Sequence, residues 1–142
     1  MRSRQTVEIN GTIITEEDIW PWMVTAFEGG SNYWFGKINV QHYTRDYYNL
    51  FANDFDSTTN MWRWHHQVPF LLAGKSGYKG HELEIETPDG TYYLTIHKLF
   101  DGISLMAKES PRHYNDLISE DYDAITADVF LQYALFEKVI FG

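Results

Sequence analysis

Short runs of alternating apolar and polar residues, separated by turn residues, open the chain. The segments 7–9 and 12–14 are rich in β-branched side chains and flank Asn10-Gly11. Because Asn-Gly supplies the two positive-φ positions of a type I′ turn, this pattern predicts a tight β-hairpin. Thr15, followed by three acidic residues, is typical of a helix N-terminus.

The next segment changes to a helical spacing. Ile19, Met23 and Phe27 recur at every fourth position, which predicts one apolar helix face. Pro21 lies inside this pattern, so we expect either a bend there or a separate first turn ahead of the main helix. Gly29-Gly30 is expected to end the helix in either case.

The middle of the chain has a weaker pattern. Residues 37–42 are expected to form a strand. The stretch 43–81 has no sustained period of 2 or 3.6. A structureless connection of this length is uncommon, so we expect a short helix near 47–51 and a strand near 70–73.

Regular patterns return in the last two fifths of the chain. The segments 82–86 and 92–96 alternate and flank Pro88-Asp89-Gly90, which predicts a hairpin with a type I turn followed by a left-handed residue. The segments 97–108 and 121–138 predict two helices. The apolar stripe expected on the second helix comprises Ile125, Val129, Tyr133 and Phe136. The apolar end Phe141-Gly142 is expected to dock into the core or to form a subunit contact, so a homo-oligomer is one expectation.

These elements predict a single α+β domain over residues 1–142, with a small antiparallel sheet and about three helices packed on it. A chain of 142 residues has the usual size of one domain. It has no cysteine, which excludes disulfides and thiolate chemistry. We find no signal peptide and no run long enough to span a membrane, and we expect a cytoplasmic protein.

Charge and aromatic content narrow the possible partners. The formal net charge of −9 disfavours direct binding to nucleic acid or to an anionic membrane. Aromatic residues make up 17% of the chain, more than a core of this size needs. We therefore expect some aromatic side chains to line a pocket or an interface.

Two stretches carry a resemblance. The first contains Thr-Glu-Glu-Asp-Ile at 15–19, Glu-Gly-Gly at 28–30 and Asn-Tyr-Trp at 32–34; the second contains Ala-Asp-Val at 127–129 and Leu-Gln-Tyr-Ala-Leu-Phe at 131–136. They resemble a family of uncharacterised small proteins encoded by bacteriophages and prophages. Pro21-Trp22 and the segment 43–79 depart from that family's pattern. The resemblance implies no activity. It implies a phage setting, in which small acidic proteins often bind a component in the host cytoplasm.

The first candidate binding site is the turn at 28–34. Two glycines free its backbone for close approach, and Asn32, Tyr33 and Trp34 offer an amide, a phenol and an indole. That combination suits a planar ligand or an exposed peptide. The alternative is a Schellman-type helix end with Tyr33 and Trp34 folded back onto the core.

The second candidate is the aromatic and basic run Trp62, Arg63, Trp64, His65 and His66. Indoles interleaved with such side chains can stack a nucleotide base. The alternative is a partly buried aromatic strand or loop. Adjacent histidines on a strand point in different directions, so we expect no metal and no cofactor here.

Acidic segments are the remaining candidates. The loop beginning at Asp54 lacks the glycine and the final glutamate of an EF-hand, so we reject a calcium site. A later acidic series could imitate a phosphate backbone, or its members could simply favour helix N-termini. This series comprises Asp116, Glu120, Asp121, Asp123 and Asp128.

The sequence contains no nucleophile elbow and no Walker-type loop, so no catalytic residue is assigned. We favour a non-enzymatic phage or prophage protein that binds a host protein, as a possible antagonist of host defence. The alternatives are a protein that sequesters a signalling nucleotide through an aromatic pocket, a small hydrolase, and a virion-associated structural protein.

Overall fold

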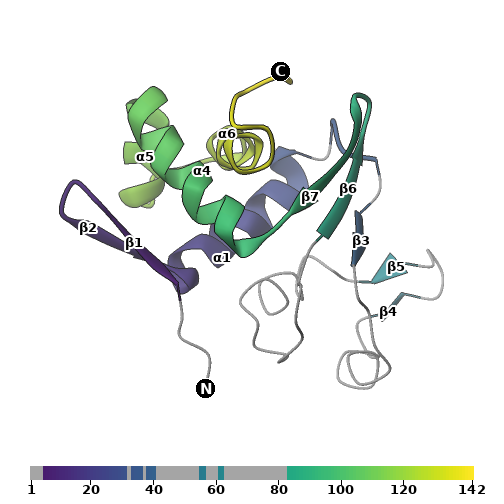
Figure 1. Cartoon of the computed structure of the whole chain (residues 1–142), viewed down its shortest axis with the longest axis horizontal. Helices are drawn as coiled ribbons and strands as arrows, with labels where there is room; N and C mark the ends of the chain where they lie inside the picture. Colours follow the sequence, from purple (N-terminus) through teal and green to yellow (C-terminus); the bar gives the residue numbers. More distant parts are fainter. Residues whose placement is uncertain (1–4, 32, 37, 41–54, 57–60, 63–82) are drawn as a thin grey trace.

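The structure is a computed structural model that describes residues 5–31, 33–36, 38–40, 55–56, 61–62 and 83–142. Its strands are β1 (Thr6–Ile9), β2 (Thr12–Thr15), β3 (Ile38–Val40), β4 (Phe55–Asp56), β5 (Met61–Trp62), β6 (Leu83–Thr87) and β7 (Gly90–Leu94). Its helices are α1 (Glu16–Thr25), the π-helical turn η1 (Ala26–Gly30), α4 (Ile96–Glu109), α5 (Pro111–Ile118) and α6 (Ala124–Phe136). The α+β prediction is confirmed, with more helices than expected (Figure 1).

The strands form three small antiparallel sheets within the described residues, where one sheet was expected. β1 pairs with β2, β4 pairs with β5, and β6 lies between β3 and β7. The turn between β1 and β2 has φ angles of 51° at Asn10 and 84° at Gly11, as the type I′ prediction requires. The predicted strand at 37–42 is confirmed as β3, and the predicted hairpin at 82–96 as β6 and β7. The helix and strand expected near 47–51 and 70–73 lie outside the described residues.

Helix α1 runs without interruption through Pro21, so the alternative of a separate first turn is wrong. Thr15 begins the helix with a capping box, in which its side chain accepts from the backbone N–H of Asp18 and the Asp18 carboxylate accepts from the backbone N–H of Thr15. A proline inside a helix costs about 3 kcal/mol. Burial of Ile19 and Met23 on the opposite face offsets that cost. The π turn η1 continues α1, and the chain leaves the helix after Gly30, as predicted.

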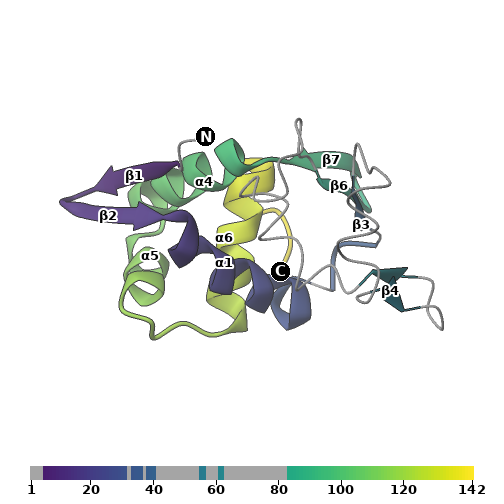
Figure 2. The same cartoon turned by 90° about the horizontal axis from the view of Figure 1, so that it is seen from below.

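The chain after α4 contains two helices, α5 and α6, whereas the sequence predicted one helix there, at 121–138. α5 begins with Pro111 at its first turn, and α6 begins later than expected because Asp123 caps it by accepting from the backbone N–H of Thr126 at 2.9 Å. α6 lies in the middle of the molecule, with contacts to α1, η1, α4, α5 and β7 (Figures 1 and 2). All residues from 126 to 135 are consequently buried. The predicted apolar stripe is wrong at Ile125, which is 66% exposed.

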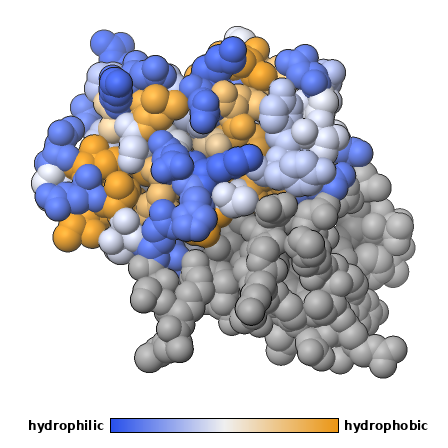
Figure 3. Space-filling model, in the orientation of Figure 1, coloured by the Kyte–Doolittle hydropathy of each residue, from blue (hydrophilic) through white to orange (hydrophobic). Residues whose placement is uncertain are grey.

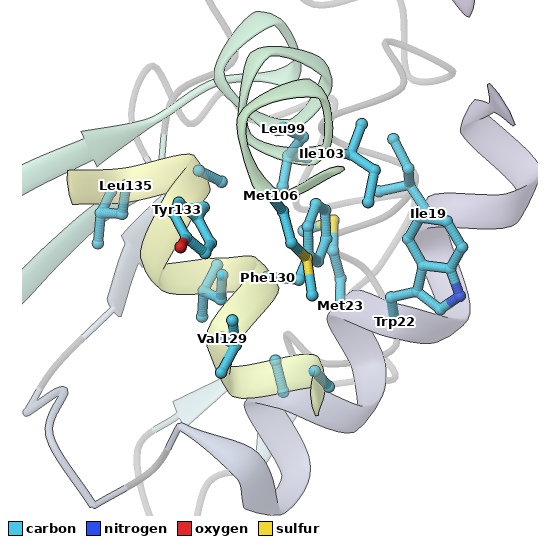
Figure 4. Packing of buried hydrophobic residues seen from close by; sticks show 14 of the residues in the cluster. Ile19, Trp22, Met23, Leu99, Ile103, Met106, Val129, Phe130, Tyr133 and Leu135 are labelled. Carbon is cyan, nitrogen blue, oxygen red and sulfur yellow. The ribbon is translucent and has the colours of Figure 1, made fainter. Parts of the chain in front are cut away.

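The hydrophobic core lies where α1, α4 and α6 meet (Figure 4). Trp22 of α1 packs its ring edge-on against Phe130 of α6, with centroids 5.5 Å apart. Gly102 allows the close approach of α4 to α6, because a Cβ at this position would lie 2.5 Å from the Cα of Ala134. None of the helices in the described ranges is long and apolar enough to cross a membrane.

Candidate functional site

The turn at 28–34 folds back onto α6. Ser31 and Trp34 are buried, whereas the Tyr33 side chain is 57% exposed. The wide π turn directs the chain toward α6, and the backbone N–H of Ser31 donates to the carbonyl of Ala26 at 2.7 Å. A Cβ on Gly30 would lie 2.4 Å from the carbonyl oxygen of Ala124, so this glycine permits the contact with α6.

The buried carboxylate of Asp128 fastens this turn to α6. Its Oδ1 accepts from Ser31 Oγ and from Trp34 Nε1, both at 2.7 Å. Its Oδ2 accepts from the Tyr33 hydroxyl at 2.7 Å and from Gln132 Nε2 at 3.1 Å. Four donors occupy about all the acceptor positions that a carboxylate offers. Asp128 therefore compensates its own burial and has no free position for a ligand.

Gln132 extends this network to the end of the chain. Its Oε1 accepts from the backbone N–H groups of Ile140 and Phe141, both at 2.9 Å, and its Nε2 donates to the Phe141 carbonyl at 3.2 Å. The Phe141 ring stacks on Trp34 with centroids 5.4 Å apart and planes 4° apart. The expected docking of the apolar C-terminus into the core is thus observed for Phe141.

Trp34 was expected to face a ligand, and the structure corrects this expectation. Its ring packs against Phe35, Phe136 and Phe141, and its N–H group is already bonded to Asp128. A buried indole needs a partner for its N–H, and Asp128 supplies it. The alternative reading, a helix end folded onto the core, holds for Trp34, although the helix ends in a π turn instead of a Schellman motif.

Tyr33 keeps an exposed ring but has an engaged hydroxyl. Desolvation of the hydroxyl end, together with its hydrogen bond to the Asp128 carboxylate and the charge of that group, raises the pKa of Tyr33 to about 12. Burial is the largest cause although more than half of the side chain is exposed. The two findings agree because the hydroxyl, and not the ring, lies against α6. This hydroxyl serves the fold, and only the ring remains free for a partner.

The other predicted site residues are described in part. Trp62 lies in strand β5, which pairs it with Phe55. Asn32, Arg63, Trp64, His65 and His66 lie outside the described residues. The expected nucleotide-stacking pocket therefore stays a prediction.

The acidic series does not form one exposed ladder. Asp128 is buried in the network, and Asp123 caps α6. The hydrogen bond from the backbone N–H of Thr126 lowers the pKa of Asp123. Glu120, Asp121 and Asp123 are exposed, Asp116 is partly buried, and Asp128 is buried. Imitation of a phosphate backbone by these five residues is therefore excluded.

A groove of about 580 Å³ lies between β2, α1 and the turn that follows α5. Apolar and aromatic side chains line it together with acidic ones. The apolar and aromatic residues are Ile13, Ile14, Pro21, Trp22, Leu117, Ile118 and Tyr122, and the acidic residues are Glu17, Asp18 and Glu120. Lys, Arg and His do not occur among the described residues that line it. We call this feature the acid-rimmed groove.

Ile13 is the most informative residue of the groove. It is 64% exposed and lines the groove, so it offers apolar surface to a partner there. Figure 3 shows apolar surface interspersed with hydrophilic residues at the left edge of the molecule, where the β1–β2 hairpin lies. Exposed apolar surface beside acidic side chains is typical of a surface that binds another protein.

A second hollow, of about 640 Å³, lies between α4 and the end of α6. Its rim carries Lys98 and Lys138 together with Asp101 and Glu137, so its charges offset one another. Lys98 also donates to the backbone carbonyl of Tyr93. Across the described ranges, no three His, Asp or Glu side chains are grouped so that they could hold a metal ion.

Sequence reasoning missed the acid-rimmed groove because its walls come from three separate segments. Only the Thr-Ile-Ile-Thr run at 12–15 carried a local signal, since two successive isoleucines in a strand must point to opposite faces.

Comparison of the chain with protein-family models, with curated proteins and with solved structures gave no match.

Proposed function

We propose that the chain is a non-enzymatic binding protein of phage or prophage origin that occupies a protein of the bacterial host. The acid-rimmed groove is the observation that carries this proposal. It combines exposed apolar surface at Ile13 with the carboxylates of Glu17, Asp18 and Glu120. The net charge of −9 adds long-range attraction toward a basic partner surface.

A nucleotide ligand is less well supported than a protein. The Trp34 ring and its N–H group are both used inside the molecule. The acidic rim repels phosphate groups at the groove. The aromatic run at 62–66 would have to carry a nucleotide site alone.

Hydrolysis is also less well supported. The Asp128 carboxylate already accepts four hydrogen bonds, so it cannot activate a water molecule without losing a structural bond. A binding role needs no such rearrangement.

The test is affinity capture from a bacterial host lysate with the tagged chain, followed by isolation of the complex. Glu120→Lys reverses one rim charge. Asp89→Lys is the matched control, because Asp89 is exposed in the turn between β6 and β7 and does not line the groove. We expect one host protein to be retained in fixed ratio by the wild type and by Asp89→Lys, and to be lost with Glu120→Lys.

Raising the salt concentration should weaken capture by the wild type, because the attraction is partly electrostatic. Retention that Glu120→Lys leaves unchanged would contradict the proposal, as would the absence of any retained protein. Turnover of a substrate by the purified chain would favour the hydrolase alternative instead.

A further inference from the structure

Strand β2 has one edge that β1 does not use. Asn10-Gly11 forms a two-residue turn, and Ile9 is paired with Thr12. In such a hairpin the pair beside the turn exchanges both backbone hydrogen bonds, and every second pair along the ladder does the same. Thr12 and Ile14 therefore direct their backbone groups toward β1. Ile13 and Thr15 direct theirs away from it.

The contacts of Thr15 agree with this assignment. Its backbone N–H donates to the carboxylate of Asp18 in α1 at 2.9 Å, on the side away from β1. The helix cap thus occupies the last outward position of β2. The backbone N–H and C=O of Ile13 point to the same side and have no described backbone partner there.

The unused edge borders the acid-rimmed groove. Thr12, Ile13 and Ile14 all line it. Figure 2 shows β1 on one side of β2 and α5 on the other, and none of the described strands lies between β2 and α5. An unpaired strand edge beside a groove with side-chain contacts is the arrangement that proteins use to bind an extended peptide by adding a strand.

We propose that the groove binds an extended partner segment with alternating basic and apolar side chains, which pairs with β2 as a third strand. Its backbone exchanges two hydrogen bonds with Ile13. Its apolar side chains pack on Ile118 and Tyr122, and its basic side chains reach the acidic rim. This inference rests on the proposed function and names the chemistry of the partner.

Charge complementarity selects this occupant over a second copy of the chain. The β2 edge of another copy would bring the sequence Thr-Ile-Ile-Thr, which has no basic residue, against the same acidic rim. Each copy also carries a net charge of −9, so the approach of two copies is repulsive. A basic segment replaces this repulsion with attraction to the acidic side chains of the groove.

The test uses a short, capped, fluorescently labelled peptide of alternating lysine and valine. A second peptide carries N-methyl groups on the backbone nitrogens of one edge, which removes their hydrogen bonds and keeps the charge. We expect the N-methylated peptide to bind about tenfold more weakly, because the hydrogen bond that its N–H donates to the Ile13 carbonyl is lost and the methyl group hinders close approach of the two strands. Glu120→Lys should weaken binding of both peptides, and Asp89→Lys should leave it unchanged.

Two variants of Ile13 separate backbone pairing from side-chain contact. Ile13→Pro removes the outward N–H without removing a bond to β1, whereas Ile13→Thr keeps that N–H. We expect peptide binding to fall about tenfold in Ile13→Pro beyond any loss in Ile13→Thr. Thermal unfolding of both variants checks that the fold is intact. In the wild type, hydrogen exchange at the Ile13 amide should slow when the peptide is added.

Equal binding of the N-methylated and unmodified peptides, with an unprotected Ile13 amide, would overturn strand addition. If the peptide does not bind but host-protein capture still depends on Glu120, this inference fails and the proposed function stands. If the chain also captures no host protein, both this inference and the proposed function are overturned. A wild-type dimer that Ile13→Pro converts to a monomer would assign the edge to a second copy and would equally overturn the inference.

Discussion

The indole N–H of Trp34 donates to the carboxylate of Asp128 at 2.7 Å, across 94 positions of sequence. Both side chains are buried. A charged acceptor in the interior is costly unless its hydrogen bonds are satisfied, and here the donors come mainly from the turn after η1. The bond therefore makes the placement of that turn and the burial of Asp128 depend on each other.

Replacing Asp128 with alanine should destabilise the protein by about 3 kcal/mol. The change leaves buried donors on Ser31 and Trp34 without an acceptor and opens a polar cavity. Urea unfolding followed by tryptophan fluorescence measures the effect. Asp121→Ala is the matched control, because Asp121 is exposed beside the same helix, and we expect it to change the free energy of unfolding by less than about 0.5 kcal/mol.

Asp128→Asn should have an intermediate effect. Its carbonyl still accepts from Trp34, and the Tyr33 hydroxyl can turn to accept from the new amide, but the Gln132 amide then faces another donor. Equal stability of wild type and Asp128→Ala would show that the network contributes little to the fold.

Replacing Gly102 with alanine should destabilise the protein by about 1–3 kcal/mol, the usual cost of overpacking. The new Cβ would lie 2.5 Å from the Cα of Ala134 and 2.7 Å from its backbone nitrogen, so backbone atoms would have to move. Thermal unfolding measures the change. Gly29→Ala is the control within a helical segment, because a Cβ there meets nothing within 4 Å. A lower melting temperature for Gly29→Ala than for Gly102→Ala would contradict this account of how α4 approaches α6.

The contribution of Tyr33 to stability should disappear at high pH. Its pKa is raised from 10.0 to about 12, so the folded state favours the neutral phenol. The stabilisation is complete below pH 10, the value for the unfolded chain, and is lost as the pH rises through about 12. We expect the difference in unfolding free energy between wild type and Tyr33→Phe to be constant up to about pH 10 and then to shrink. Taking the difference cancels the titration of other tyrosines. A constant difference across this range would contradict the assigned hydrogen bond.

The elements that the sequence predicted correctly depend on neighbouring residues. Asn10-Gly11 determines the hairpin turn, and Thr15 with Asp18 determines the start of α1, because in each case the interacting groups lie within a few positions. Helix α5 was not predicted. Pro111 gave a local signal for its start, since proline is favoured at the first turn of a helix. The helix was missed because too few apolar positions repeat in a segment of eight residues.

The surroundings of α6 could not be predicted in the same way. Its burial on all sides depends on contacts with elements that lie both far away and nearby in sequence. One local signal did exist: Asp128 and Gln132 are four positions apart and so share a helix face, within an otherwise apolar run. Polar residues paired in that way within an apolar helix indicate a buried network. Its partners Ser31 and Trp34 became identifiable only with the fold.

Replacing Glu137 with glycine should stabilise the protein by about 1 kcal/mol, the usual cost of holding a residue other than glycine in a left-handed conformation. Glu137 ends α6 with φ 64° and ψ 11°, and its backbone N–H donates to the carbonyl of Tyr133 at 3.0 Å. Glycine keeps that hydrogen bond and removes the strain of the Cβ atom. Lys138→Gly, one position later, is the matched control; it adds backbone freedom to the unfolded chain without relieving a positive φ, so it should not stabilise. Urea unfolding of the two variants tests the prediction, and a gain for Lys138→Gly with none for Glu137→Gly would show that the strain lies elsewhere.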